Sequence, residues 1–284
     1  DKVFLRSVDQ GKQLTFRELE LLCSRFSRYL ADRNLGAGDK ISVIGKNSAE
    51  TLLIYLGTLY HGAVINPINV DESPENIYKI LALVKPQLVF YDREMSLETK
   101  GLQRLELLPF GSYDAPGEID EDFFATLAQV APELAPVSRA EGDLAEVVFT
   151  SGTTSTPKGV CITRGSLFAM GAEIVDKCGL TRDDVLLEYR NYNWASAQLL
   201  TILSSVLSGA TLVLARRFSR SRFPGWLVDY GVTVAAGVPT VINILAKDPV
   251  ALPNGGHASL RFMTSSSAPL SLASQLEFEK VYGI

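Results

Sequence analysis

A loop rich in hydroxyl side chains stands between two short apolar runs near the middle of the chain. Residues 145–163 read AEVVFTSGTTSTPKGVCIT. The hydroxyl donors are Ser151, Thr153, Thr154, Ser155 and Thr156. Gly152 and Gly159 let the backbone approach a ligand closely, and Lys158 adds a compact positive charge with three N–H donors. This composition is suited to holding phosphate.

The runs on either side of the loop predict two strands. Val147–Phe149 and Val160–Thr163 are rich in β-branched residues and are bounded by turn residues. A Walker-type phosphate loop would need G-x-x-x-x-G-K-[ST] between a strand and a helix. Counting from Gly152, the sixth place is Pro157, and glycine follows Lys158. No G-x-G-x-x-G follows a strand candidate, so the Rossmann fingerprint is missing too.

The stretch from Phe149 to Val160 resembles the signature loop of the adenylate-forming (AMP-binding) superfamily, which includes acyl- and aryl-CoA synthetases, adenylation domains of peptide synthetases and luciferases. The family pattern is roughly [Y/F]-[T/S]-S-G-T-T-G-x-P-K-G-V, and this chain reads F-T-S-G-T-T-S-T-P-K-G-V. Ser155 replaces the usual glycine, and Arg164 replaces a common histidine. The alternative, a solvated Ser/Thr-rich hairpin turn, rarely combines Gly, Pro and Lys in this order.

The resemblance implies a nucleotide site made from two segments. In the signature loop, the residues expected to wrap the β- and γ-phosphates of ATP are Thr150, Ser151, Gly152, Thr153 and Thr154. Lys158 would supply charge to phosphate or anchor the loop to a carboxylate. Further along, Ser265–Leu270 (SSSAPL) looks like the family's S-G-[A/G]-A-P-L turn, which lies against adenine. This likeness assigns Ser267, Ala268 and Pro269 to the nucleotide, with Ser271 as the N-cap of the next helix.

The resemblance also implies a substrate pocket. Trp194 falls where many members have a histidine or an aromatic at the carboxylate end of the substrate, although core packing is an equal alternative for its indole. Gly237 and Val238 lie in a segment that resembles the family's next pocket-lining turn. Peptide-synthetase domains place an Asp near the start of the pocket helix to hold an α-amine. No acid lies next to Trp194, and Glu188 precedes the segment, so a fatty or aromatic carboxylate is expected.

Composition excludes several other classes. The chain has 284 residues, 46% of them hydrophobic and 21% charged, which allows one large domain or two packed domains. A net charge of −5 argues against a nucleic-acid partner. The three cysteines, Cys23, Cys161 and Cys178, form no disulfide or metal-ligand spacing, which is typical of a reducing, cytoplasmic setting.

The two histidines, His61 and His257, exclude a His-rich metal centre. We interpret His61 as a packed helix-end residue rather than a catalyst. No signal peptide or transmembrane segment is expected, because the most apolar stretches, 52–65 and 199–215, are interrupted by polar residues and glycines.

Helix and strand signals alternate along the chain, which predicts an α/β fold of mostly parallel sheets with helices on both faces. Helix starts are predicted at Thr15 with Glu18, at Asn47 with Glu50, and at Ser73 before Pro74. Strands are predicted at 41–44, 63–65, 88–91, 185–189, 211–215, 232–236 and 260–263, and further helices at 166–177, 195–207 and 271–281. Residues 92–143 are the least regular. We interpret 1–284 as part of an N-terminal AMP-binding domain, with subdomains 1–140 and 141–284.

The family reaction implies the expected activity. A carboxylate attacks the α-phosphate of ATP to give an acyl-adenylate and pyrophosphate, and a thiol, usually that of CoA, then displaces AMP. We therefore expect an acid–thiol ligase that uses ATP, Mg²⁺ and CoA on a small carboxylic acid. The alternatives are an acyl-AMP ligase that loads a carrier protein, and a truncated homologue that binds nucleotide without turnover. The sequence does not determine the oligomeric state, and a homodimer is one of the alternatives.

The chain is expected to be an N-terminal piece of such an enzyme. It starts without Met, which suggests that something precedes it, and it ends at Tyr282-Gly283-Ile284, where the family proceeds to its Y-G-x-T-E motif. The Glu of that motif holds Mg²⁺ in the family. That Glu and the small C-terminal domain with the catalytic lysine are expected beyond Ile284. We therefore expect no catalytic residue and no metal ligand in this chain, and no activity from it alone.

Overall fold

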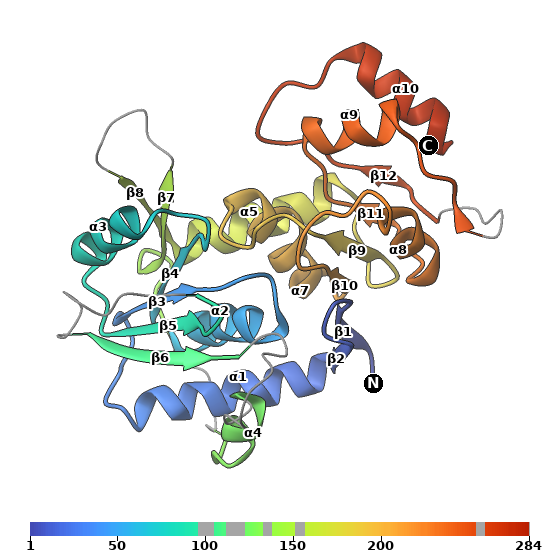
Figure 1. Cartoon of the computed structure of the whole chain (residues 1–284). Helices are drawn as coiled ribbons and strands as arrows, with labels where there is room; N and C mark the ends of the chain where they lie inside the picture. The colour runs from blue at the N-terminus through green and yellow to red at the C-terminus, as the bar shows by residue number, and fades with distance from the viewer. Residues whose placement is uncertain (96–104, 112–122, 133–137, 151–156, 254–258, 284) are drawn as a thin grey trace. The chain divides into compact units, whose positions relative to one another are not determined.

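The computed structural model describes residues 1–95, 105–111, 123–132, 138–150, 157–253 and 259–283. The chain forms two compact units, one of residues 1–2 and 14–169 and the other of residues 3–13 and 170–284. Each unit holds a mostly parallel sheet with helices packed against it (Figure 1). This arrangement confirms the α/β fold that the alternation of elements predicts. The subdomain boundary at 140/141 stays a prediction.

The sheet of the first unit has the order β6-β5-β3-β4-β7-β8. All neighbours pair in parallel except β7 and β8, which form an antiparallel hairpin. Its elements are α1 (Phe16–Ala31), β3 (Lys40–Ile44), α2 (Ala49–His61), β4 (Val64–Ile68), α3 (Pro74–Val84), β5 (Leu88–Asp92), β6 (Glu106–Phe110), α4 (Phe123–Ala128), β7 (Leu144–Thr150) and β8 (Lys158–Thr163).

The sheet of the second unit has the order β12-β11-β9-β10-β1-β2. The neighbouring pairs β12–β11, β11–β9, β9–β10 and β10–β1 are parallel. The elements are β1 (Val3–Ser7), β2 (Lys12–Thr15), α5 (Arg164–Lys177), β9 (Val185–Glu188), α6 (Ala195–Ala197), π-helix η1 (Gln198–Leu203), α7 (Ser204–Ser208), β10 (Thr211–Leu214), α8 (Phe223–Asp229), β11 (Val234–Ala235), α9 (Pro239–Lys247), β12 (Phe262–Met263) and α10 (Leu272–Tyr282). Strand β2 and helix α5 continue across the points where the chain passes between the units.

Local signals at two helix starts are confirmed. Thr15 caps α1 in a complete capping box with Glu18, and Ser73 caps α3 with Pro74 in the first turn. The predicted cap of α2 at Asn47 is wrong. Ser48 holds that position, and its hydroxyl accepts a hydrogen bond from the backbone N–H of Thr51. Asn47 and Ser48 are both competent caps, so local propensity does not choose between them.

Several elements were not predicted. Strand β1 was missed because its partner is β10, which lies far along the sequence. Strand β6 falls in the region expected to be irregular, and helices α8 and α9 lie between predicted strands. The helix predicted at 195–207 is present, but its middle turn is the π-helix η1.

His61 is packed at the end of α2. Its ring is buried, with Nδ1 2.9 Å from Ser27 Oγ and Nε2 3.0 Å from the carbonyl oxygen of Leu35. These contacts confirm the interpretation of His61 as a packed helix-end residue.

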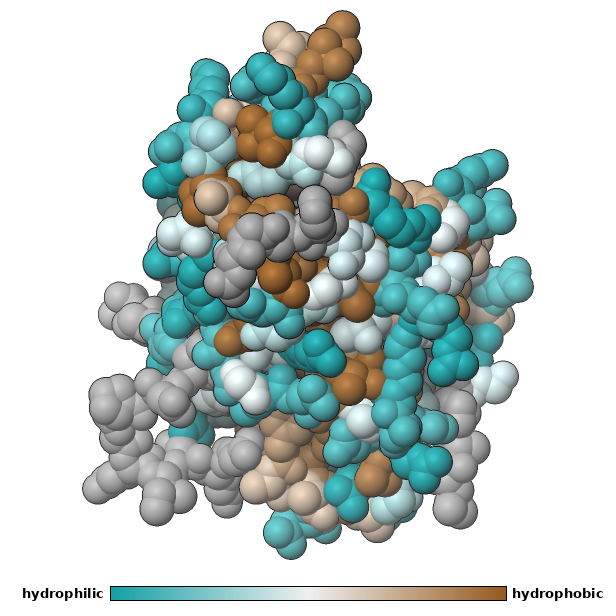
Figure 2. Space-filling model, turned by 90° about the vertical axis from the view of Figure 1, so that its right-hand side faces the viewer, coloured by the Kyte–Doolittle hydropathy of each residue, from teal (hydrophilic) through white to brown (hydrophobic). Residues whose placement is uncertain are grey.

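Much of the surface is polar. On the face drawn in Figure 2, hydrophobic residues appear as separate brown areas among hydrophilic ones. Among the exposed large hydrophobic residues are Leu272 and Leu276 of α10, which are 67% and 54% exposed. Within the described ranges, no helix combines the length and the apolar character needed to cross a bilayer.

Candidate functional site

The signature segment forms the predicted β-hairpin in the first unit. Strands β7 and β8 pair antiparallel, and Thr150 lies opposite Lys158 where the two strands meet the loop. A Cβ on Gly159 would lie 3.2 Å from the ring of Phe149 and 3.3 Å from Val147. Ser151, Gly152, Thr153 and Thr154 lie outside the described residues. The structure therefore places the two ends of the predicted phosphate loop and leaves its tip a prediction.

Lys158 begins β8 with an exposed side chain. Among the described residues, no carboxylate lies within 4.0 Å of its ammonium group. Of the two roles predicted for Lys158, an anchor to a carboxylate therefore has no partner in the described part of the chain. A role in binding an external anion is compatible with this exposure.

In the second unit, the predicted adenine turn and the predicted pocket turn are hydrogen-bonded to each other. The N–H of Ser266 donates to the carbonyl of Gly237 at 3.3 Å, and the N–H of Gly237 donates to Thr264 Oγ1 at 3.2 Å. A Cβ on Gly237 would lie 2.0 Å from the carbonyl oxygen of Thr264, so only glycine fits there. Val238 follows directly as the N-cap residue of α9.

The residues after Ser266 face solvent. Ser267, Ala268 and Pro269 are all exposed, and Ser267 has a φ of 74°, a left-handed conformation that is uncommon outside glycine. Ser271 caps α10 as predicted, since its hydroxyl accepts from the N–H of Ser274. The turn thus presents small side chains and backbone, which suits contact with a flat base.

Trp194 is not a core residue. Its side chain is 42% exposed, and it is the N-cap residue of α6. The N–H of Gln198, the first residue of η1, donates to the carbonyl of Trp194 at 3.1 Å. The core-packing alternative for the indole is therefore excluded, and the pocket-wall assignment stays a prediction.

The structure adds a buried ion pair that sequence reasoning did not identify. Glu188 ends β9, and its carboxylate Oε2 lies 2.6 Å from Nη2 of Arg190, with side chains 0% and 1% exposed. Nε of Arg190 donates to Oε1 at 3.0 Å. The backbone N–H groups of Tyr189 and Arg190 also donate to Oε1, and the hydroxyl of Thr201 donates to Oε2 at 2.6 Å.

Arg190 uses its remaining donors on the segments around it. Nη1 donates to Ser266 Oγ at 3.1 Å, and Nη2 donates to the carbonyl of Ser196 at 3.0 Å. The pair thus joins the pocket segment that contains Trp194 to the adenine turn. Ligands of open α/β sheets bind outside the carboxyl ends of the strands, which is where this pair lies. One sequence signal could have revealed this ion pair. Two charged residues, Glu188 and Arg190, stand at the end of a strand that is otherwise apolar.

A second arginine–carboxylate pair lies at the opposite ends of the same strands. Asp184 precedes β9, and its two carboxylate oxygens lie 2.7 and 2.8 Å from Nη1 of Arg261, which precedes β12. Thr233, which precedes β11, donates to Asp184 Oδ1 at 2.7 Å. Burial raises the pKa of Asp184, but hydrogen bonds from Arg261, Thr233 and the N–H of Thr181, with the charge of Arg261, outweigh burial and leave the pKa below its usual value.

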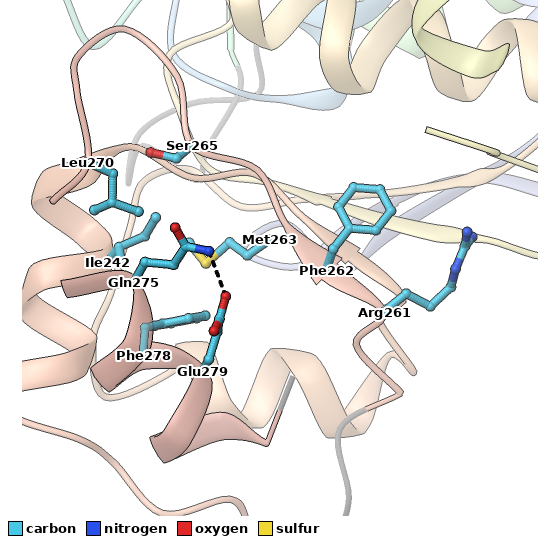
Figure 3. A pocket seen from close by; sticks show the side chains of 9 residues that line it. All are labelled: Ile242, Arg261, Phe262, Met263, Ser265, Leu270, Gln275, Phe278 and Glu279. Atoms are coloured by element: carbon cyan, nitrogen blue, oxygen red, sulfur yellow. Dashed lines mark hydrogen bonds between the residues drawn. The ribbon is translucent and has the colours of Figure 1, made fainter. Parts of the chain in front are cut away.

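A pocket of about 390 Å³ lies between α9, β12 and α10. Its apolar walls are formed by Ile242, Met263, Leu270 and Phe278, and its polar groups include Ser265 and Gln275. In Figure 3, the side chains of Met263, Gln275 and Glu279 point toward one another, and Gln275 donates to Glu279 at 2.8 Å. Through Ser265 the pocket adjoins the predicted adenine turn.

The two residues that resemble the start of the Y-G-x-T-E motif form a helix end. Tyr282 is the last residue of α10, with its ring 4.8 Å from that of Phe278, and Gly283 is the left-handed C-cap. Within the described ranges, no three or more His, Cys, Asp or Glu side chains gather into a group that could hold a metal ion.

Curated proteins of known name match nearly the whole of this chain in sequence. The chain is 32% identical over 291 residues to a sulfoacetate–CoA ligase of Cupriavidus necator, with 100% of this chain and 55% of the relative covered. It is 31% identical over 281 residues to 4-coumarate–CoA ligase 3 of Arabidopsis thaliana, covering 95% and 49% of the two chains. The chain thus spans about half the length of these curated relatives.

Solved structures match the fold over nearly the whole chain. ATP-bound MatB from Rhodopseudomonas palustris superposes with a TM-score of 0.87 at 23% identity, covering 100% of this chain and 55% of that one. An acyl-CoA synthetase of Brucella canis gives 0.83 at 27% identity, covering 99% and 53%. The family model described as AMP-binding enzyme matches residues 1–284. Because that match covers every residue, the chain belongs to the AMP-binding enzyme family.

Proposed function

We propose that the protein activates a carboxylic acid with ATP and transfers the acyl group from the resulting adenylate to CoA. The observation that carries this proposal is the signature hairpin, which brings Thr150 and Lys158 side by side at the base of a loop of hydroxyls and glycine. The relatives named as CoA ligases support the same class of reaction.

In this reaction, the protein positions two reactants and neutralises charge that develops on phosphate. Thr150 through Thr154 would hold the β- and γ-phosphates, and Lys158 would add charge to them. Ser267, Ala268 and Pro269 would lie against adenine, while Trp194, Gly237 and Val238 would line the acid pocket. Mg²⁺ would screen phosphate charge when bound, and the described residues contain no cluster of three or more His, Cys, Asp or Glu side chains that would hold it by themselves.

The nature of the acid is part of the proposal. Glu188 is the acid nearest to the pocket segment, and its carboxylate is buried and paired with Arg190. It therefore has no free charge with which to hold an α-amine, which supports a fatty or aromatic acid over an amino acid. The relatives act on sulfoacetate, 4-coumarate and crotonobetaine or carnitine by their names, so the test must include more than one class of acid.

Acid-dependent exchange of pyrophosphate into ATP tests the adenylation half. The full-length protein is assayed with octanoate, 4-coumarate, sulfoacetate and phenylalanine. We expect exchange with at least one acid other than phenylalanine, and a large drop in the Lys158→Ala variant. Exchange with none of these acids would favour the alternative of a nucleotide-binding homologue without turnover.

The acceptor is tested with the acid that supports exchange. Addition of CoA should then give an acyl-CoA thioester detectable by mass spectrometry. If exchange occurs but CoA is not acylated, a carrier protein becomes the acceptor to test. A cytoplasmic location and a homodimer are also proposed, and fractionation of cells and light scattering of the purified protein would check them.

A further inference from the structure

We propose that the buried Glu188–Arg190 pair is a positioning device that fixes the acid pocket relative to the nucleotide turn. The proposal rests on the proposed function, because it concerns the meeting of the two reactants. Neither residue would touch the reacting atoms. Both would act through the backbone segments that they hold.

The geometry joins all three ligand-facing segments of the second unit. Arg190 donates to the carbonyl of Ser196 at 3.0 Å and to the hydroxyl of Ser266 at 3.1 Å. The hydroxyl of Ser266 lies 3.4 Å from the carbonyl of Gly237 and can pass the connection on as a donor. One guanidinium thus connects the segment after Trp194, the adenine turn and the pocket turn.

Glu188 fixes the orientation of that guanidinium. Its carboxylate accepts from Nε and Nη2 of Arg190 and from the hydroxyl of Thr201. Thr201 lies in η1, and π-turns inside helices are frequent at functional sites. Because the carboxylate is anchored by two backbone N–H groups at the end of β9, the fork of Arg190 has one defined direction.

Stability alone gives little reason for such a pair. Buried ion pairs replaced by apolar groups of similar volume are often equally stable, because desolvation offsets the attraction between the charges. The strands involved also have another tie, through Asp184 and Arg261 at their amino ends. What the buried pair adds is a defined distance between the segments predicted to hold the acid and the adenine.

The test removes the pair without leaving a buried charge. In the full-length protein, Glu188→Gln is combined with Arg190→Met, and the matched control combines Asp184→Asn with Arg261→Met at the amino ends. Pyrophosphate exchange is measured with the most active acid of the panel, together with the melting temperature. For the Glu188/Arg190 variant, we expect kcat to fall by about 10²-fold, the usual effect of a displacement near 1 Å, with KM for ATP and the melting temperature unchanged. The control should keep the kcat of the wild type.

Wild-type kcat in a folded Glu188/Arg190 variant, or an equal loss in the control, would overturn the proposal. If the double variant does not fold, Arg190→Lys decides. Lysine keeps the charge beside Glu188 but lacks the fork that reaches both Ser196 and Ser266, so its kcat should also fall, and full activity would refute the proposal.

A second measurement is independent of turnover. Amide hydrogen exchange of the ligand-free protein should quicken in residues 194–201 and 264–270 of the Glu188/Arg190 variant and stay at wild-type rates in the control. If the wild type shows no exchange of pyrophosphate, the proposed function fails. The amide rates then decide alone whether the pair couples the two segments, and unchanged rates would refute that coupling.

Discussion

The sheet of the second unit carries an arginine–carboxylate pair at each end of the same parallel strands. At the amino ends, Asp184 and Arg261 link the starts of β9 and β12, and the arginine side chain is 45% exposed. At the carboxyl ends, Glu188 and Arg190 are 0% and 1% exposed. Each carboxylate also accepts from a threonine, Thr233 or Thr201.

The two pairs differ in what they hold. Arg261 also donates to the carbonyl of Gly179, between α5 and β9, and lies over the ring of Phe262 in β12, so the amino-end pair joins parts of the scaffold. Arg190 reaches Ser196 and Ser266, in segments predicted to meet ligands. The same chemistry therefore serves the sheet at one end and the candidate site at the other, as expected where ligands bind at the carboxyl ends of strands.

The largest expected effect comes from breaking the buried pair on one side. Glu188→Ala leaves the guanidinium of Arg190 buried without its carboxylate, which should lower the free energy of unfolding by about 3–5 kcal/mol. Arg261→Met leaves Asp184, whose side chain is 3% exposed, bonded to Thr233 and to the N–H of Thr181, and should lower the free energy of unfolding by less, about 1–3 kcal/mol. Urea denaturation at pH 7 measures both. Equal losses would contradict the difference in burial between the two ends.

Thr201 and Thr233 allow a more closely matched comparison of the two ion pairs, because each threonine donates to the carboxylate of its own pair. Thr201→Val and Thr233→Val each remove a hydroxyl donor to a carboxylate, and each should lower the free energy of unfolding by about 1–3 kcal/mol. Only Thr201→Val should also lower kcat for pyrophosphate exchange, because Thr201 orients Glu188 and through it Arg190. A loss of kcat in Thr233→Val at unchanged fold would erase the functional distinction.

A smaller effect is expected from the single contact between the buried pair and the adenine turn. Ser266→Ala removes the hydroxyl that accepts from Arg190 Nη1, and it should lower the free energy of unfolding by about 0.5–1.5 kcal/mol. In this variant, kcat for pyrophosphate exchange should fall, by less than in the Glu188/Arg190 double variant, and KM for ATP should stay at the wild-type value. Ser274→Ala, which removes a hydroxyl from exposed α10 near the cap of that helix, serves as the control and should keep the kcat of the wild type.

The smallest effect is a pH dependence confined to the amino ends. The pKa of Asp184 is lowered in the folded protein, so its ionised form stabilises the fold above the unfolded pKa of about 3.9. That contribution is lost as the pH falls through the lowered folded pKa. Asp184→Asn should therefore be less stable than the wild type at pH 6, and the gap should close toward acid pH in urea titrations. A gap that stays constant with pH would contradict the shift.

Local chemistry predicted much of this fold from the sequence alone. The capping box at Thr15, the Ser73-Pro74 start and the hairpin from Val147 to Thr163 depend on residues near one another, and all three are confirmed. The prediction of Asn47 as the N-cap of α2 was wrong because Asn47 and the adjacent Ser48 are both suitable N-cap residues. The π-turn η1 was missed because no propensity distinguishes it from a regular helical turn.

The candidate site was less predictable than the fold. The signature residues could be named, but Arg190 could not be assigned, since its contact with Ser266 joins residues 76 positions apart. From the sequence, Glu188 was considered only in asking whether an acid near the pocket could hold the α-amine of a substrate. Its actual role depends on Arg190 and Thr201, and these contacts exist only after β9 and η1 have packed together.

Strand β1 has a consequence for synthesis. Val3–Ser7 lies between β2 and β10 in the second sheet, and Leu5 pairs with Leu212. A ribosome that adds 5–20 residues per second needs about 10–40 s to reach β10 after β1. Throughout that delay Phe4 and Leu5, which are completely buried in the finished fold, lack the β10 side of their surroundings. The second sheet can therefore close around β1 only late in translation, after its distant partner has been made.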